Sequence, residues 1–111
     1  PLLSVLKKFK KSLDDSSFIV GHNVDFDINV IAAEAFRSGI SLPVKGYPKK
    51  CTMKTSARLC NIRRGSGYKY PSLPELYNIL FGIRHPEHHR ALSDARSCME
   101  CYFEMKKRGI I

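Results

Sequence analysis

The short apolar run Phe18-Ile19-Val20 is the feature that most constrains the fold of this chain. Its β-favouring residues lie between the turn-forming residues 14–17 and Gly21, which predicts a buried strand over 18–20. Apolar residues at helical spacing flank the run, over 2–13 before it and from Asp25 to about 37 after it. A strand that leads directly into a helix indicates an α/β fold. It also places the intervening residues at the carboxyl end of the strand, where such folds collect ligand groups.

The remaining sequence predicts helices separated by turn-rich segments. Ser72 and Glu75 have the spacing of a capping box, which marks the start of a helix. An apolar stripe from Ala91 to Met105 predicts a long final helix. The expected order is a loop over 40–50, a second short strand near 51–53, a helix to about 60, a basic loop over 61–70, a helix over 73–80 and a long helix over 91–108.

Length and charge set limits on what the chain does. A length of 111 residues with 43% apolar content fits one globular domain over 1–111. No apolar run approaches the roughly 18 to 20 residues that span a bilayer, which predicts a soluble, cytoplasmic protein without a membrane partner. The formal charge of +9 favours a polyanionic partner, with nucleic acid as the leading candidate. Each single lysine or arginine run is better interpreted as a solvated helix face.

Four cysteines, at irregular spacing and without an export signal, are expected to be reduced thiols. Cys98 and Cys101 form a C-x-x-C pair, which is compatible with a zinc or redox site. A structural zinc site needs a second pair of ligands at a defined spacing, and no such pair accompanies this one. Core packing is therefore the favoured interpretation, and a small structural metal protein is the alternative.

The first group of chemically capable residues follows the predicted strand and runs from His22 through Asn23 to Asp27. Asp27, in the first turn of the next helix, is placed to direct a carboxylate at a cation beyond the strand end. The competing interpretation is a favourable charge at a helix N-terminus. Spacing alone favours the second interpretation.

The second group, from His88 to Asp94, precedes and opens the last helix. A histidine that titrates near neutrality and an aspartate that binds a hard cation are the parts of a hydrolytic site. The alternative is that Ser93 and Asp94 only mark the helix start, with His85, His88 and His89 in a polar loop.

Together the two groups resemble the DnaQ-like (DEDDh) 3′→5′ exonuclease family of the ribonuclease H-like superfamily. Residues 21–27 (GHNVDFD) are similar to its second motif, H-N-x-x-F-D, and residues 89–94 (HRALSD) to its third, H-x-A-x-x-D. Residues 51–58 and 72–76 resemble the elements between these motifs. The resemblance covers nearly the whole chain.

This resemblance implies a role for each matching residue. Asp27 and Asp94 would be metal-binding carboxylates, and His89 would be the general base that deprotonates the attacking water. His22, Asn23 and Phe26 would position the substrate. The implied reaction is hydrolysis of DNA or RNA from single-stranded or 3′ ends, releasing nucleoside monophosphates with two Mg²⁺ or Mn²⁺ ions roughly 3.5 to 4 Å apart.

The family's first motif, a D-x-E on the first strand, has no counterpart in the 111 residues. The resemblance therefore predicts the C-terminal portion of an exonuclease domain, a partial ribonuclease H-like α/β fold that is mostly helical, with one or two remaining parallel strands. Such a fragment would be inactive alone. Its open sheet edge would self-associate or pair with the missing N-terminal segment. A non-catalytic module that binds nucleic acid or another partner is a further alternative.

Overall fold

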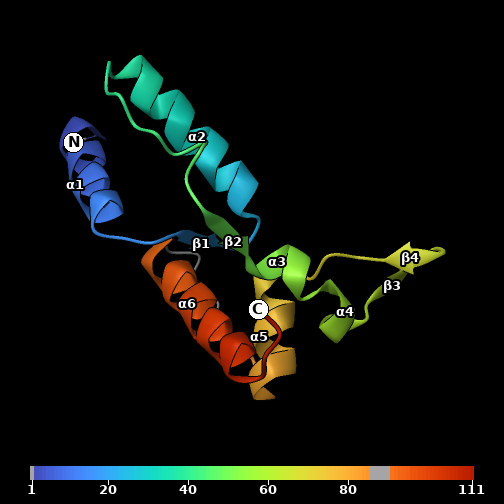
Figure 1. Cartoon of the computed structure of the whole chain (residues 1–111). Coiled ribbons are helices and arrows are strands. Elements are labelled where there is room, and N and C mark those ends of the chain that lie inside the picture. The colour runs from blue at the N-terminus through green and yellow to red at the C-terminus, as the bar shows by residue number, and fades with distance from the viewer. Residues whose placement is uncertain (1, 86–90) are drawn as a thin grey trace.

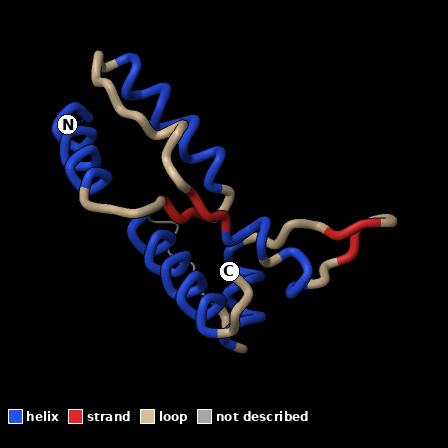
Figure 2. The backbone as a smooth tube through the Cα atoms, viewed as in Figure 1, coloured by secondary structure: helices blue, strands red, loops and turns tan. Residues whose placement is uncertain are grey.

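The computed structural model of the chain describes residues 2–85 and 91–111 (Figures 1 and 2). These residues form a mixed α/β structure that is mostly helical and contains two small sheets. The predicted fold class is thereby confirmed. The elements, in chain order, are α1 (Leu2–Asp14), β1 (Ile19–Gly21), α2 (Val24–Arg37), β2 (Lys49–Cys51), α3 (Thr52–Thr55), α4 (Ala57–Cys60), β3 (Arg63–Arg64), β4 (Gly67–Tyr68), α5 (Leu73–Phe81) and α6 (Ala91–Lys107).

The parallel pair of β1 and β2 lies at the centre of the molecule. Ile19 pairs with Lys49 and Gly21 with Cys51. Helices α1 and α2 lie to one side of this pair and helices α5 and α6 to the other (Figure 1). The carboxyl end of β1 therefore faces the place where the two groups of helices meet.

Two separate hydrophobic clusters stabilise the two sides. One, around α1 and α2, contains Leu13, Val24, Ile28 and Val44. The other, between α5 and α6, contains Leu76, Tyr77, Leu80, Cys101 and Met105. The radius of gyration is 15.3 Å, whereas a compact domain of this length has about 13 Å. The central sheet is thus too small to join the two clusters into one core. No described helix has the length and apolar character needed to cross a membrane.

The second strand lies slightly earlier than the sequence suggested. The expectation for 51–53 was wrong in position: β2 ends at Cys51, and Thr52 begins a helix. Thr52 is fully buried, and its hydroxyl lies 3.3 Å from the Gly21 carbonyl and 2.9 Å from His22 Nδ1. These contacts hold Thr52 beneath the end of β1. The helix expected to follow is two single turns, α3 and α4, separated at Ser56.

The predicted basic loop over 61–70 contains a short antiparallel hairpin, which corrects that expectation. Arg63 pairs with Tyr68 and Arg64 with Gly67, so Gly65 and Ser66 form a two-residue turn. Gly65 has φ 61°, a conformation that glycine adopts readily at the first position of such a turn. Each strand has only two residues, too few for an alternating pattern to reveal.

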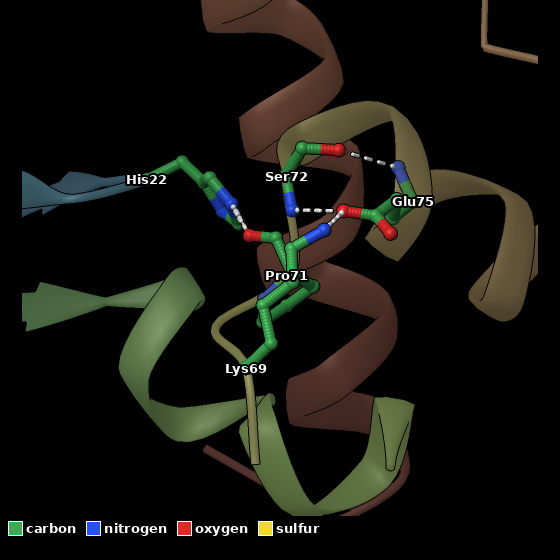
Figure 3. Close-up of polar contacts among 5 residues, drawn as sticks. All are labelled: His22, Lys69, Pro71, Ser72 and Glu75. Carbon is green, nitrogen blue, oxygen red and sulfur yellow. Dashed lines mark hydrogen bonds and ion pairs between the residues drawn. The ribbon is translucent and has the colours of Figure 1, made fainter. Parts of the chain in front are cut away.

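The capping box at the start of α5 gives a prediction for stability (Figure 3). Glu75 accepts hydrogen bonds from Lys69 Nζ (2.8 Å) and the Ser72 amide (2.9 Å), and Lys69 and the amide hold its pKa at about 2, below the usual 4.5. Because this pKa is lowered on folding, the stabilisation is complete above about pH 4.5 and is lost as the pH falls toward 2.

Glu75→Gln should therefore lower the free energy of unfolding at pH 7 by about 1 kcal/mol, since the carboxylate is partly exposed and solvent weakens its ion pair. Urea titrations of both proteins between pH 2 and 7 would measure the difference. The difference in unfolding free energy between the two proteins should disappear as the pH approaches 2. A difference that stays constant with pH would show that the charge of Glu75 contributes nothing.

Candidate functional site

A cavity of about 1230 Å³ opens at the carboxyl end of β1. Its walls come from the segment before β1, from β1 itself, from the first turn of α5 and from one face of α6. The described residues that line it and bear chemically active groups are His22, Asp27, His85, Asp94 and Cys98. The apolar and basic residues that line it include Phe18, Val20, Met99, Tyr102, Phe103 and Lys106.

Asp27 reaches this cavity from the first turn of α2. Its Oδ2 lies against Gly21, where a Cβ atom would stand 3.1 Å away. Partial burial of the carboxyl raises the pKa of Asp27, although a favourable interaction with His22 opposes that change. The neighbouring acid behaves differently, because Asp25 forms ion pairs with Lys49 (3.0 Å) and Lys54 (2.9 Å) that lower its pKa. Of the two acids in this segment, Asp27 is the one left available to a cation.

Asp94 reaches the same cavity from another helix, in the first turn of α6. Within the described ranges, neither Asp94 nor Asp27 forms an ion pair with a lysine or arginine. Two carboxylates that pair with no described lysine or arginine thus line one cavity of a chain whose formal charge is +9. Such an arrangement of hard oxygen ligands suits a divalent cation.

His22 connects β1 to the chain that enters α5 (Figure 3). Its Nε2 lies 2.8 Å from the Pro71 carbonyl, so this nitrogen donates its proton there. Its Nδ1 lies 2.9 Å from the Thr52 hydroxyl. Burial lowers the pKa of His22, although the Pro71 bond and Asp27 oppose that change. A neutral ring with Nε2–H donating and Nδ1 accepting fits these contacts. The His22 side chain thus holds the backbone at Pro71, two residues before Leu73, which lines the cavity.

Asn23 and Phe26 are not among the residues that line the cavity. Asn23 is exposed and holds the left-handed conformation (φ 71°) that turns the chain into α2, and its side chain makes no capping bond. Phe26 is 62% exposed. Their predicted contact with substrate remains a prediction.

The predicted general base, His89, and its neighbour His88 lie outside the described residues. His85 does not fit the polar-loop alternative. It is 5% exposed, lines the cavity and places Nε2 2.8 Å from Ser97 Oγ, while its buried Nδ1 has no hydrogen-bond partner among the described residues. The sequence does not predict this burial, because a single histidine before a proline carries no periodic signal.

Cys98 and Cys101 both face inward from α6. Cys101 is fully buried in the α5–α6 cluster, and desolvation raises its pKa to about 12, so it is a neutral thiol near pH 7. Burial also raises the pKa of Cys98. Thiols that resist ionisation are poor metal ligands, so these positions favour the core-packing interpretation.

The carboxylate oxygens at the cavity are ligands that a hard cation prefers, but the described residues supply too few of them to hold one ion. Asp27 and Asp94 supply carboxylate oxygens, which Mg²⁺ and Mn²⁺ prefer. Across residues 2–85 and 91–111, no group of three or more His, Cys, Asp or Glu side chains is placed to hold one metal ion. Asp27 and Asp94 are thus two carboxylates at one cavity, without a complete set of metal ligands among the described residues.

The close fit at Gly21 gives a prediction. A methyl group there would stand 3.1 Å from Asp27 Oδ2 and from two atoms of Val24, one of them backbone, so either α2 or the Asp27 carboxyl must move. Gly21→Ala should lower the free energy of unfolding by about 1 to 3 kcal/mol. Thermal or urea unfolding would measure it.

Gly46→Ala is the matched control, because a Cβ atom at Gly46 meets nothing within 4 Å. Its stability should stay within about 0.5 kcal/mol of the wild type. Equal stabilities for the two variants would contradict the packing described for Gly21.

Comparison with known proteins identifies a family for this chain. No curated protein matches the chain. A family model described as "Exonuclease", RNase T, matches residues 2–102, which include β1, the Asp27 segment and Asp94. The match spans most of the 111 residues and confirms the resemblance to DEDDh exonucleases of the ribonuclease H-like type. This chain therefore belongs to the RNase T exonuclease family.

Proposed function

We propose that this chain carries part of the active site of a metal-dependent 3′→5′ exonuclease that hydrolyses phosphodiester bonds of DNA or RNA and releases nucleoside monophosphates. The observation that carries the proposal is the pair Asp27 and Asp94. They come from separate helices, line one cavity and have no cationic partner among the described residues. Membership of an exonuclease family gives this pair its chemical context.

Each residue has a distinct role in the proposal. Asp27 and Asp94 bind the cation, and His89 removes a proton from the attacking water. His22 holds the Pro71 carbonyl and so fixes the cavity rim. Divalent ions, when bound, would lower the pKa of water and stabilise the leaving 3′ oxygen.

We further propose that acids from outside these 111 residues complete the site, because the sequence contains no D-x-E. Two divalent cations carry four positive charges, which two carboxylates do not balance. The edge of β1 away from β2 has no strand partner among the described residues, and Phe18 and Val20 beside it line the cavity. Met99 and Phe103 of α6, both more than half exposed, line it too. Further strands would cover these apolar groups.

A cleavage assay tests this proposal. Single-stranded DNA and RNA labelled at the 5′ end would be incubated with Mg²⁺ or Mn²⁺ and either the 111-residue chain or the longest natural protein that contains it. The longer protein should shorten the strands stepwise from the 3′ end, and EDTA should stop the reaction. The 111-residue chain should release little or no mononucleotide.

A blocked 3′ end is the control, because an exonuclease of this polarity needs a free terminus. A longer protein that carries a D-x-E yet leaves both DNA and RNA intact would contradict the proposal. Binding without cleavage would instead support the non-catalytic module.

The open edge of β1 gives a separate expectation for the 111-residue chain. An unpaired apolar strand invites pairing with another strand, so the chain should self-associate as its concentration rises. Analytical ultracentrifugation would measure this. A stable monomer at high concentration would contradict it.

A further inference from the structure

The hairpin of β3 and β4 (residues 63–68) has no role in the proposed chemistry, yet it has the features of a binding element. It extends away from the two helical groups into solvent (Figures 1 and 2). Tyr68 in the hairpin and Tyr70 just after it are 50% and 52% exposed. Arg63 and Arg64 are also exposed. Exposed aromatic groups that gather beside basic residues, rather than standing singly on the surface, are candidates for a binding surface.

The hairpin lies within the most basic part of the chain. No aspartate or glutamate occurs between Glu34 and Glu75. Asp25 neutralises two lysines of this stretch, and Glu75 neutralises Lys69. Among the described residues, no carboxylate pairs with Arg63 or Arg64. The basic residues of the stretch are Arg37, Lys45, Lys49, Lys50, Lys54, Arg58, Arg63, Arg64 and Lys69.

Aromatic and basic groups are interleaved on the hairpin. The guanidinium of Arg63 lies 5.0 Å from the centre of the Tyr68 ring, a cation–π contact across the paired strands. This contact orders the ring while half of its surface stays exposed. An ordered aromatic ring beside arginines that pair with no described carboxylate is the combination that proteins use to stack bases and bind the intervening phosphates.

The segment that leaves the hairpin leads to the cavity. The Lys69 amide donates to the Ile62 carbonyl (2.7 Å), and its side chain binds Glu75. His22 binds the Pro71 carbonyl, as Figure 3 shows. Leu73 and Pro74 then line the cavity that contains Asp27 and Asp94. The chain from Tyr68 to Leu73 spans at most roughly 18 Å even when extended. A short length of nucleic acid could therefore contact both places.

We propose that the hairpin and Tyr70 bind single-stranded nucleic acid and lead its 3′ end to the Asp27–Asp94 cavity. Bases stack on Tyr68 and Tyr70, and phosphates pair with Arg63 and Arg64. A single strand is required because a duplex keeps its base faces stacked internally. The direction of the strand rests on the proposed exonuclease function, whereas the binding itself needs no catalysis.

Fluorescence anisotropy with a labelled single-stranded oligonucleotide in EDTA tests the binding. Tyr68→Ala should weaken binding roughly 5- to 100-fold, the usual effect of losing one stacked base, and Tyr68→Phe should bind nearly as well as the wild type. The double variant Arg63→Gln/Arg64→Gln should reduce the slope of log K against log salt by about 1.4, because two phosphate contacts are lost.

The control is Lys7→Gln/Lys8→Gln, which removes the same charge from exposed positions of α1, at the far side of the molecule from the hairpin (Figure 1). It should leave both the affinity and the salt slope nearly unchanged. Equal losses from the two double variants would overturn the proposal, because they would show diffuse attraction to the whole surface. Binding of a blunt duplex as tightly as the single strand, with no effect of Tyr68→Ala, would also overturn it.

Two outcomes separate this proposal from the proposed function. Hairpin-dependent binding by a longer protein that never trims 3′ ends would support the hairpin and contradict the exonuclease. If Tyr68→Ala and Arg63→Gln/Arg64→Gln leave both the trimming rate and the affinity unchanged, the exonuclease proposal is supported. The binding role of the hairpin is then overturned. Circular dichroism of each variant would verify that the fold is retained. If the arginine variant unfolds, the comparison of Tyr68→Phe with Tyr68→Ala still tests the stacking.

Discussion

His89→Ala is expected to lower the rate of 3′ trimming by a natural protein that contains the complete domain by roughly 10² to 10⁴, the usual contribution of a positioned base. The reason is the motif spacing: His89 stands two residues before Ala91 and five before Asp94, whose carboxylate lines the cavity. Asp94→Asn should cost about 10³ or more, because a neutral amide is a weak ligand for a divalent cation. Single-turnover rates on a 5′-labelled strand would measure both effects.

His88→Ala is the matched control, since it changes the adjacent residue of the same type and lacks the motif spacing. It should change the rate far less than His89→Ala. A larger effect at His88 would show that the roles of the two histidines have been assigned wrongly.

Leu76→Ala is expected to give the largest loss of stability, about 2 to 5 kcal/mol. Leu76 is fully buried between α5 and α6, where it packs with Leu80, Cys101 and Met105. A chain with two small clusters has few contacts that could close over the resulting void. Small domains have only about 5 to 15 kcal/mol in total, so this loss is a large share of it. Urea unfolding of both proteins would measure the difference.

Ile79→Ala serves as the control, because Ile79 lies on the same helix but is 39% exposed. It should cost less than half as much as Leu76→Ala, since less apolar surface is lost from the interior. Equal costs would mean that α5 does not bury the face described for it.

The parts of the fold that the sequence predicted are those with local signals. The Phe18–Val20 run and the helix after it became β1 and α2, shifted by one residue at each start. The capping box of Ser72 and Glu75 formed as its spacing indicated. Such signals act within a few residues of the chain, so no tertiary information was needed to interpret them.

The parts that the sequence did not reveal depend on distant contacts. Thr52 was expected within a strand, but its buried hydroxyl, held near Gly21 and His22, begins a helix instead. The alternative interpretation placed His85 in a polar loop, but it packs against Ser97 and Tyr77. The hairpin over 63–68 is local, but its strands of two residues each are too short for an alternating pattern to predict them.

The candidate site likewise combines features that the sequence predicts with features that depend on contacts between distant residues. The motif resemblance identified Asp27 and Asp94, and the structure places both at one cavity. Sequence alone did not distinguish the availability of Asp25 from that of Asp27, because the lysines that bind Asp25 lie in and just after β2, more than twenty residues away. Charge partners across space, rather than spacing along the chain, determine which carboxylate remains available.

The most direct test of the metal site proposed for Asp27 and Asp94 is a titration of the 111-residue chain with Mn²⁺, followed by nuclear magnetic resonance. Paramagnetic broadening depends steeply on distance and is visible even when only a small fraction of the protein binds metal. The resonances of Gly21 and Ala95, next to the two carboxylates, should broaden first. Asp27→Asn and Asp94→Asn should each remove that broadening. Broadening centred on Asp14 and Asp15, or unchanged in both variants, would contradict a metal site shared by Asp27 and Asp94.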